Sequence, residues 1–148
     1  MLKEGMKLSY TRTVSPEETA AKVASGTLDV YGTPMMIAFM EKTSFDLAEK
    51  ELGEGESTVG ISVNIKHNKA NKIGDEVVCE STLVKVDGRR LVFDVKVTHN
   101  GVVVGEGTHE RFIINVEKFL AKKKKKNYNS GRQCCLPVFI FVVCLLLW

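Results

Sequence analysis

Alternation of apolar and polar positions marks four strands in this chain, and a weaker one precedes them. Residues 59–67 are the clearest case, because Val59, Ile61, Val63 and Ile65 share a row that ends at His67. Two dipeptides typical of tight hairpins, Asp-Gly at 87–88 and Asn-Gly at 100–101, separate the last three segments. We therefore expect strands near residues 7–14, 59–67, 76–86, 91–99 and 102–115, of which the last three form an antiparallel meander.

Two helix start signals lie in the first half of the chain. Ser15 to Glu18 has the form of a capping box with a proline at the first helical position, which predicts a short helix to about Ala24. Thr33, followed by another proline, predicts the cap of a longer helix that runs to about Leu52. Its front half, residues 35–40, is apolar on every side, so a sheet must wrap it. The predicted class is α+β.

Charge and cysteine content narrow the function classes. The chain has 148 residues, with 21 basic and 18 acidic side chains, but six of the basic ones follow Ala121 and no acidic one does. Residues 1–121 are thus mildly acidic, which argues against a nucleic-acid partner. They contain only Cys79, hence no internal disulfide and no cysteine metal site, as in a reducing cytoplasm. Residues 1–10 lack a signal-peptide core.

Glu41 stands on the apolar stripe of the longer helix, four residues after Ile37 and four before Phe45. A carboxylate there needs a partner or a changed pKa, which makes it a candidate general base or nucleophile. The alternative is that the helix already reaches solvent at this position. His67 is a candidate for acid–base work, or it fills a partly buried strand end. Thr33 is more easily explained as a helix cap than as a catalytic hydroxyl.

A second polar group follows in the last long strand. Gly105, Gly107, His109 and Arg111 share one face, and glycines within a strand often mark a close backbone approach or a bulge. Arg111 could hold a carboxylate or a phosphate there, or make an ordinary ion pair. His99 lies beside a turn, where we expect it to be exposed.

Four motifs, taken together, resemble the fluoroacetyl-CoA thioesterase-like branch of the hotdog-fold thioesterases. They are Tyr-Gly-Thr-Pro-Met-Met with Phe-Met-Glu (31–41), Gly-Glu-Ser-Thr-Val-Gly-Ile-Ser-Val with His67, Val-Asp-Gly-Arg-Arg-Leu (86–91) and Gly-Glu-Gly-Thr-His-Glu-Arg (105–111). Each is weak alone, but their order and spacing are specific. The resemblance extends from about Gly5 to Phe119.

The resemblance implies a site and a fold. The family's catalytic threonine, glutamate and histidine fall on Thr33, Glu41 and His67. A glycine near the acyl group falls on Gly60, and a substrate-contacting arginine falls on Arg111. The implied fold is a five-stranded antiparallel sheet wrapped around one long helix, and two such sheets usually join edge to edge in a homodimer. The implied reaction is hydrolysis of an acyl-CoA thioester, with neither a metal nor any cofactor beyond the coenzyme A of the substrate.

One departure bears on the substrate. The family member devoted to fluoroacetyl-CoA has aromatic gating residues in the loop before the threonine, whereas residues 25–30 here read Ser-Gly-Thr-Leu-Asp-Val. This difference favours an ordinary short or branched acyl group. Two other functions remain open on the same fold, a non-catalytic acyl-CoA-binding module and a hydroxyacyl-CoA dehydratase.

The sequence predicts three segments: a domain over residues 1–121, a basic and polar linker over 122–133, and an apolar tail over 134–148. The tail could anchor the protein in a membrane beside the basic run, with Cys134 and Cys135 as acylation sites. Its 15 residues fall short of the about 20 that a span needs. Packing against the domain is disfavoured, because no helical stripe is visible. The interpretation we favour is a shifted reading frame after an adenine-rich lysine run.

Overall fold

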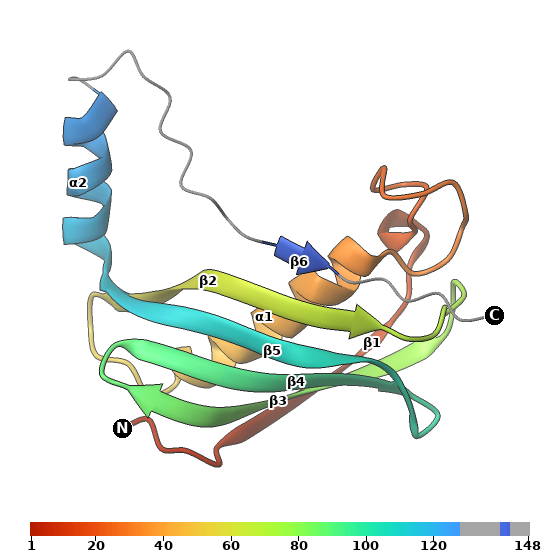
Figure 1. Ribbon diagram of the computed structural model, residues 1–148, viewed down its shortest axis with the longest axis horizontal. Helices are drawn as coiled ribbons and strands as arrows, with labels where there is room; N and C mark the ends of the chain where they lie inside the picture. The colour runs from red at the N-terminus through yellow and green to blue at the C-terminus, as the bar shows by residue number, and fades with distance from the viewer. Residues whose placement is uncertain (128–139, 143–148) are drawn as a thin grey trace.

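The computed structural model describes residues 1–127 and 140–142, and its main feature is an antiparallel sheet curved around one helix (Figure 1). Five long strands form the sheet: β1 (Lys7–Thr13), β2 (Glu56–His67), β3 (Glu76–Asp87), β4 (Arg90–His99) and β5 (Val102–Asn115). The long helix is α1 (Thr33–Glu49). The predicted α+β arrangement and all five predicted strands are therefore confirmed, with only small shifts at their ends.

The strands follow the order β1-β3-β4-β5-β2 across the sheet. The β3–β4 and β4–β5 connections are the hairpins predicted from the Asp-Gly and Asn-Gly pairs. Asn100 and Gly101 both have positive φ, 49° and 76°, as a two-residue turn of the type that favours Asn-Gly requires. On its other side β5 pairs with β2, which places Arg111 opposite Gly60 and His109 opposite Val63.

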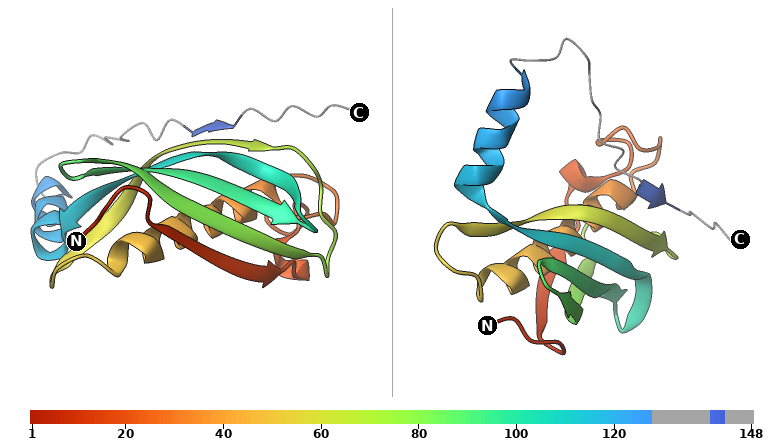
Figure 2. Two further views of the ribbon diagram at one scale, coloured as in Figure 1. Left: turned by 90° about the horizontal axis from the view of Figure 1, so that it is seen from below. Right: turned by 60° about the vertical axis from the view of Figure 1, so that its left-hand side comes forward.

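Helix α1 lies along the concave face of the sheet (Figure 2). Its side chains Met36, Phe39, Met40, Leu47 and Ala48 are buried, as are the inward rows of β3 and β4. A Cβ atom at Gly105 would collide with the Met36 side chain, so this strand glycine allows the helix to approach closely. The helix ends at Glu49 rather than at about Leu52, and residues 50 and 51 form a turn.

A bulge in β2 reverses part of the predicted row. The pairing with β5 slips between Gly60 and Ser62, so that residues before the slip face the opposite side from the one that alternation predicts. Val63, Ile65 and His67 face the helix as expected, but Ile61 is 45% exposed. Thr58 and Gly60 take the inward positions, opposite Ile113 and Arg111. The prediction that Val59 and Ile61 line the core was wrong for this reason.

The segment before α1 is less helical than predicted. A single turn of 3-10 helix, η1 (Pro16–Glu18), replaces the helix expected to reach Ala24. The capping box itself is present, since the Ser15 N–H donates to Glu18 Oε2 at 2.9 Å. Glu18 also accepts a hydrogen bond from Arg12 Nη1 at 2.6 Å, which draws its carboxylate toward β1 and away from a longer helix.

Two further elements follow β5. Helix α2 (Val116–Asn127) crosses the boundary predicted at residue 121, so the lysines placed in the linker begin within a helix. A short strand, β6 (Ile140–Val142), pairs parallel with Val63–Ile65 of β2. Residues 128–139 and 143–148 lie outside the described part, and with them Cys134, Cys135 and most of the predicted tail. No helix that the structure describes is long and apolar enough to cross a membrane.

Candidate functional site

The first residue of α1 meets the last residue of β2. Thr33 Oγ1 lies 2.9 Å from His67 Nδ1, a hydrogen bond between segments 34 positions apart. Gly32, not Thr33, occupies the cap position, and it has extended backbone angles. The prediction of Thr33 as the helix cap was therefore wrong by one position. Its hydroxyl is turned to the histidine instead of to the backbone of its own helix.

His67 is poised to exchange a proton at its second nitrogen. Nε2 is buried and has no hydrogen-bond partner among the residues that the structure describes, whereas Nδ1 is paired with Thr33. Such an atom costs about 1–3 kcal/mol if it stays unpaired, so a ligand or water that pairs with it is favoured. Burial lowers the pKa of the His67 imidazole, and the nearby Lys69 backbone opposes this effect. The edge of the ring faces Tyr31, with 6.5 Å between the ring centroids.

The start of α1 offers few other donors. Pro34 has no N–H, and the N–H groups of Met35 and Met36 both donate to the Gly32 carbonyl oxygen, at 2.9 and 3.1 Å. The amide and hydroxyl of Thr33 are thus the groups at this helix end that can stabilise negative charge on a ligand.

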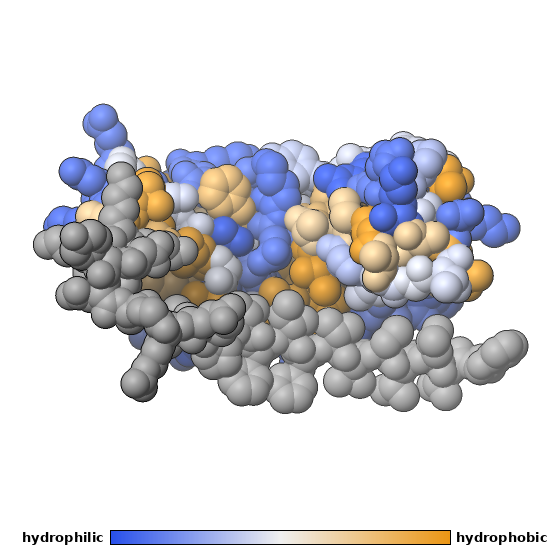
Figure 3. Space-filling view, turned by 90° about the horizontal axis from the view of Figure 1, so that it is seen from above, coloured by the Kyte–Doolittle hydropathy of each residue, from blue (hydrophilic) through white to orange (hydrophobic). Residues whose placement is uncertain are grey.

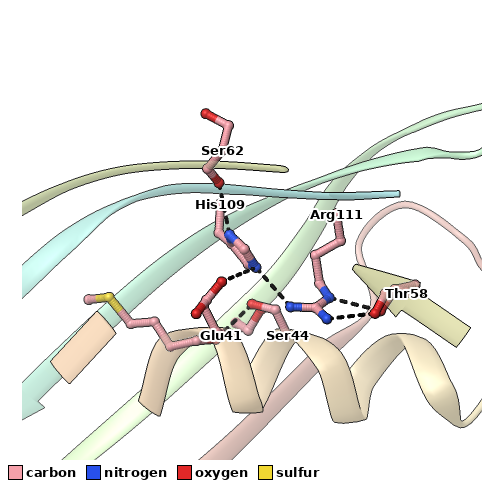
Figure 4. Close-up of polar contacts among 8 residues, drawn as sticks. Glu41, Ser44, Thr58, Ser62, His109 and Arg111 are labelled. Carbon is pink, nitrogen blue, oxygen red and sulfur yellow. Dashed lines mark hydrogen bonds and ion pairs between the residues drawn. The ribbon is translucent and has the colours of Figure 1, made fainter. Parts of the chain in front are cut away.

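Glu41 lies two turns further along α1, on the side of the helix that faces His109 and Arg111 (Figure 4). A Cβ atom built on Gly60 would be only 2.7 Å from Glu41 Oε1, so this carboxylate occupies the space that a larger residue would fill. The Glu41 side chain is 40% exposed, and within the described ranges no hydrogen bond to its carboxylate is found. Both predictions for Glu41 hold in part: it stands on the inner stripe, and it still reaches solvent.

Arg111 lies beneath Glu41 and is 7% exposed. Its Nε donates to Thr58 Oγ1 at 2.8 Å, its Nη2 to the Thr58 carbonyl oxygen at 3.0 Å, and its Nη1 lies 3.1 Å from His109 Nε2. The ring of Phe45 lies 5.3 Å from the guanidinium carbon. All three nitrogens thus have protein partners, none of which is an anion. The arginine is held within the sheet rather than extended toward a ligand.

His109 completes this group, although the sequence analysis did not assign it a role. It is 1% exposed, its Nδ1 lies 2.9 Å from the Ser62 carbonyl oxygen, and its Nε2 lies 3.7 Å from Glu41 Oε1. Its position two residues before Arg111 on an inward row was visible in the sequence. What alternation could not show was the bulge that brings Ser62 to it.

The predicted residues therefore form two groups on the surface of α1. One contains Thr33 and His67, and the other contains Glu41, Gly60 and Arg111. Eight residues separate Thr33 from Glu41, about 12 Å of helix rise. A ligand that touched both groups would have to lie along the helix, with one end at the strand glycine and the other at the histidine.

Other features of the described chain do not offer a better site. A hollow of about 670 Å³ lies on the outer face of the sheet, but its lining mixes lysines with carboxylates and contains none of the predicted site residues. Burial raises the pKa of the Cys79 thiol to about 11, so it is a poor nucleophile. In the part of the chain that the structure describes, no three histidine, cysteine or carboxylate side chains are grouped as metal ligands would be.

Comparison with known proteins gives consistent matches. The model of a family described as fluoroacetyl-CoA-specific thioesterase matches residues 14–117. The fluoroacetyl-CoA thioesterase of Streptantibioticus cattleyicolor is 36% identical over 99 residues, which are 66% of this chain and 70% of that protein. A solved structure of the fluoroacetyl-CoA thioesterase FlK is 28% identical, with a TM-score of 0.80, covering 85% of this chain and 98% of that one.

More distant structures share the architecture. A thioesterase superfamily member from Thermus thermophilus is 25% identical, with a TM-score of 0.79, over 85% of this chain and 93% of its own. A hot-dog-like protein from Thermanaerovibrio acidaminovorans is 24% identical, with a TM-score of 0.74, over 87% of this chain and 94% of its own. The second match bears on the fold alone.

The position of Gly60 leads to a prediction about stability. In Gly60→Ala the new methyl group would lie 2.7 Å from Glu41 Oε1 and 3.2 Å from Cε1 of the fixed His109 ring. We expect this crowding to lower the free energy of unfolding by about 1–3 kcal/mol, measured by urea denaturation. Gly53→Ala is the control, because its methyl group would meet Glu56 at an ordinary 3.6 Å. Equal stability of the two variants would contradict the close packing of Gly60 against the His109 ring.

Proposed function

The chain belongs to the family of fluoroacetyl-CoA-specific thioesterases, and we propose that it hydrolyses the thioester of a short-chain acyl-CoA to a free acid and coenzyme A. The hotdog fold implied by the sequence resemblance is confirmed by the solved structures that match. Acyl-CoA thioesterase activity follows from membership of the family. The size of the acyl group and the roles of individual residues are our proposals.

One observation carries the assignment of roles. The Thr33–His67 hydrogen bond of 2.9 Å fixes the imidazole at the start of α1 and leaves its Nε2 buried without a partner among the described residues. A fixed imidazole with one free nitrogen is suited to carry a proton to a leaving group. The Glu41 carboxylate, without a hydrogen-bond partner in the described ranges, is suited to take a proton from water or to attack a carbonyl carbon.

The reaction we propose uses water and the side chains of this chain. Glu41 takes a proton from a water molecule, whose oxygen adds to the thioester carbonyl carbon; alternatively, the carboxylate itself attacks and water later releases the acid. The Thr33 amide and hydroxyl stabilise the negative charge on the carbonyl oxygen, and the backbone at Gly60 contacts the acyl group. When the carbon–sulfur bond breaks, the protonated form of His67 gives its Nε2 proton to the departing thiolate. The Glu41 carboxyl then loses its proton to solvent, and His67 takes one up again before the next turnover.

The proposal extends to the substrate and the compartment. The loop at residues 25–30 has no aromatic side chain, so we propose an ordinary short or branched acyl group rather than fluoroacetyl. No cofactor is needed besides the coenzyme A of the substrate. We propose the cytoplasm as the compartment, because Cys79 is buried and free.

A panel of acyl-CoA esters, assayed for release of free thiol, tests the function directly. We expect turnover of acetyl-, propionyl- or isobutyryl-CoA, and Glu41→Gln should lower it by roughly a hundredfold or more, because an amide cannot act as the base. Glu54→Gln, in an exposed turn, is the matched control and should keep the wild-type rate.

The same panel separates the alternatives. Binding of an ester without thiol release would indicate a non-catalytic module, and loss of water from a hydroxyacyl-CoA would indicate a dehydratase. An unchanged rate in Glu41→Gln would contradict the assignment of Glu41.

His67 should give the reaction a characteristic pH dependence. Burial lowers the pKa of the imidazole from its usual value of 6.5. The ring therefore stays neutral at pH values somewhat below 6.5 and becomes protonated only as the pH falls through the lowered pKa. Only the protonated ring can give a proton to the thiolate, so we expect kcat/KM to decline as the pH rises through this lowered value, a limb that reports groups of the free enzyme. His67→Ala should remove this limb and lower turnover roughly a hundredfold. Full activity in His67→Ala would return this residue to a packing role.

We further propose a homodimer that forms through the β2 side of the sheet. Among the long strands β2 is at the edge, and β6 pairs with only Val63–Ile65 of it. Ile61 beside this edge, and Phe112, Val116 and Leu120 on or near the outer face, remain 37–53% exposed. Figure 3 views the molecule from above, which is the side on which β2 lies in Figure 1. It shows apolar surface between polar areas. An exposed strand edge beside exposed apolar side chains favours pairing between two copies of the chain.

Light scattering after gel filtration tests this assembly. The full chain and a chain that ends at Asn127 should both have twice the monomer mass and equal activity per subunit, because the proposed interface and site lie within residues 1–127. An active monomer at micromolar concentration would rule out the dimer as the functional unit.

A further inference from the structure

His109 is a buried histidine whose protonation is fixed by its two neighbours. The Ser62 carbonyl oxygen, 2.9 Å from Nδ1, can only accept a hydrogen bond, so the ring proton must be on Nδ1. A neutral ring then has a lone pair on Nε2, which accepts from Arg111 Nη1 at 3.1 Å. The ring also stacks on Phe93, with 6.4 Å between centroids, which limits its rotation.

The charges around the ring agree with a neutral state. Burial lowers the pKa of the His109 imidazole, and the Arg111 charge acts in the same direction. The Ser62 carbonyl and the carboxylates of Glu41 and Glu110 oppose them. A guanidinium has no acceptor and stays protonated, so a second proton on Nε2 would face its N–H group directly. The 3.7 Å approach of Glu41 Oε1 to Nε2 is therefore a contact with a neutral ring and not an ion pair.

We propose that His109 is a positioning residue of this site, which holds the Arg111 guanidinium beneath the Glu41 carboxylate by accepting a hydrogen bond at Nε2. The proposal rests on the assignment of Glu41 to the thioester hydrolysis described above. Thr58 holds the guanidinium at Nε and Nη2, and among the described residues only His109 holds Nη1 (Figure 4). Without that third bond the guanidinium can pivot about Thr58, and Glu41 loses the fixed positive charge below it.

The β2 bulge is what makes this arrangement possible. In a regular ladder every second carbonyl of β2 would bind the backbone of β5, whereas a bulge interrupts the ladder and re-aims nearby groups. The slip between Gly60 and Ser62 leaves the Ser62 carbonyl to the His109 side chain, and it leaves Gly60 opposite Arg111. The bulge thus determines which nitrogen of His109 is protonated, where the Arg111 guanidinium lies and how much space is left for Glu41.

The protonation of His109 can be measured without any assay of turnover. Long-range proton–nitrogen NMR spectra of the full chain should show His109 as the neutral form with its proton on Nδ1. This signal should not change over the pH range in which a histidine of ordinary pKa titrates. Titration of His109 in that range, or a proton on Nε2, would overturn the proposal whatever the activity of the protein.

Two substitutions of similar size separate positioning from packing. His109→Gln keeps an oxygen that can accept from Arg111, whereas His109→Leu fills the space without an acceptor. We expect His109→Leu to lower kcat between roughly tenfold and a hundredfold with little change in KM, and His109→Gln to recover most of the loss. His99→Gln, beside the Asn-Gly turn, is the control and should match wild type. Equal losses in Leu and Gln variants would reject an acceptor role.

A double-mutant cycle tests whether His109 acts through Arg111. In an Arg111→Gln background, His109→Leu should change kcat by less than about twofold, because the partner it positions is already gone. The same loss in both backgrounds would overturn the proposal. The Arg111 guanidinium protons should also exchange faster with solvent in His109→Leu than in His109→Gln. That readout stands even if no ester is hydrolysed, so failure of the positioning role and failure of the proposed function remain distinguishable.

Discussion

A positive charge buried within the sheet is the constraint on which the rest of this site depends. The Arg111 side chain is almost fully enclosed between β2, β5 and α1, where an unpartnered guanidinium would be costly. Removing one partner of a buried ionic group typically costs about 3–5 kcal/mol. The fold meets this requirement with neutral acceptors from Thr58 and His109 and with two nearby carboxylates, Glu41 and Glu49. Because the acceptors are neutral, the negative charge of Glu41 is not consumed in a direct hydrogen bond.

Much of the architecture could be predicted from the sequence, because its signals are local. Alternation with period two and two turn dipeptides were enough to locate the strands and order the meander from β3 to β5. The apolar start of α1 predicted a helix wrapped by the sheet. The errors also have local causes. Alternation assumes regular pairing, so it placed Ile61 inside, whereas the bulge turns it outward. The capping signal at Ser15 was real, but Glu18 is also bound by Arg12, which no helix pattern reveals.

The site was predictable only in part, for a related reason. Glu41 and Arg111 attracted attention because charged residues stood on apolar rows, and the structure does place them near each other. The assignment of Thr33, His67 and Gly60 came from a resemblance, and the sequence alone favoured plainer roles for Thr33 and His67. His109 stood on the same row as Arg111, but its significance depends on a main-chain carbonyl made available by the bulge. Contacts between a side chain and the backbone of an irregular strand leave no periodic trace in a sequence.

The separation of the two groups along α1 helps to decide which residue does which part of the chemistry. His67 is paired with a hydroxyl and not with a carboxylate, and burial lowers its pKa. A histidine of lowered pKa is a weaker base, so it is poorly suited to remove the proton of a threonine hydroxyl for attack. It is a correspondingly stronger acid once protonated, which suits delivery of a proton to a departing thiolate. In the mechanism that we propose, Thr33 orients the ring and donates to developing charge. Glu41, whose carboxylate accepts no hydrogen bond from the described residues, is then the group available to begin the reaction.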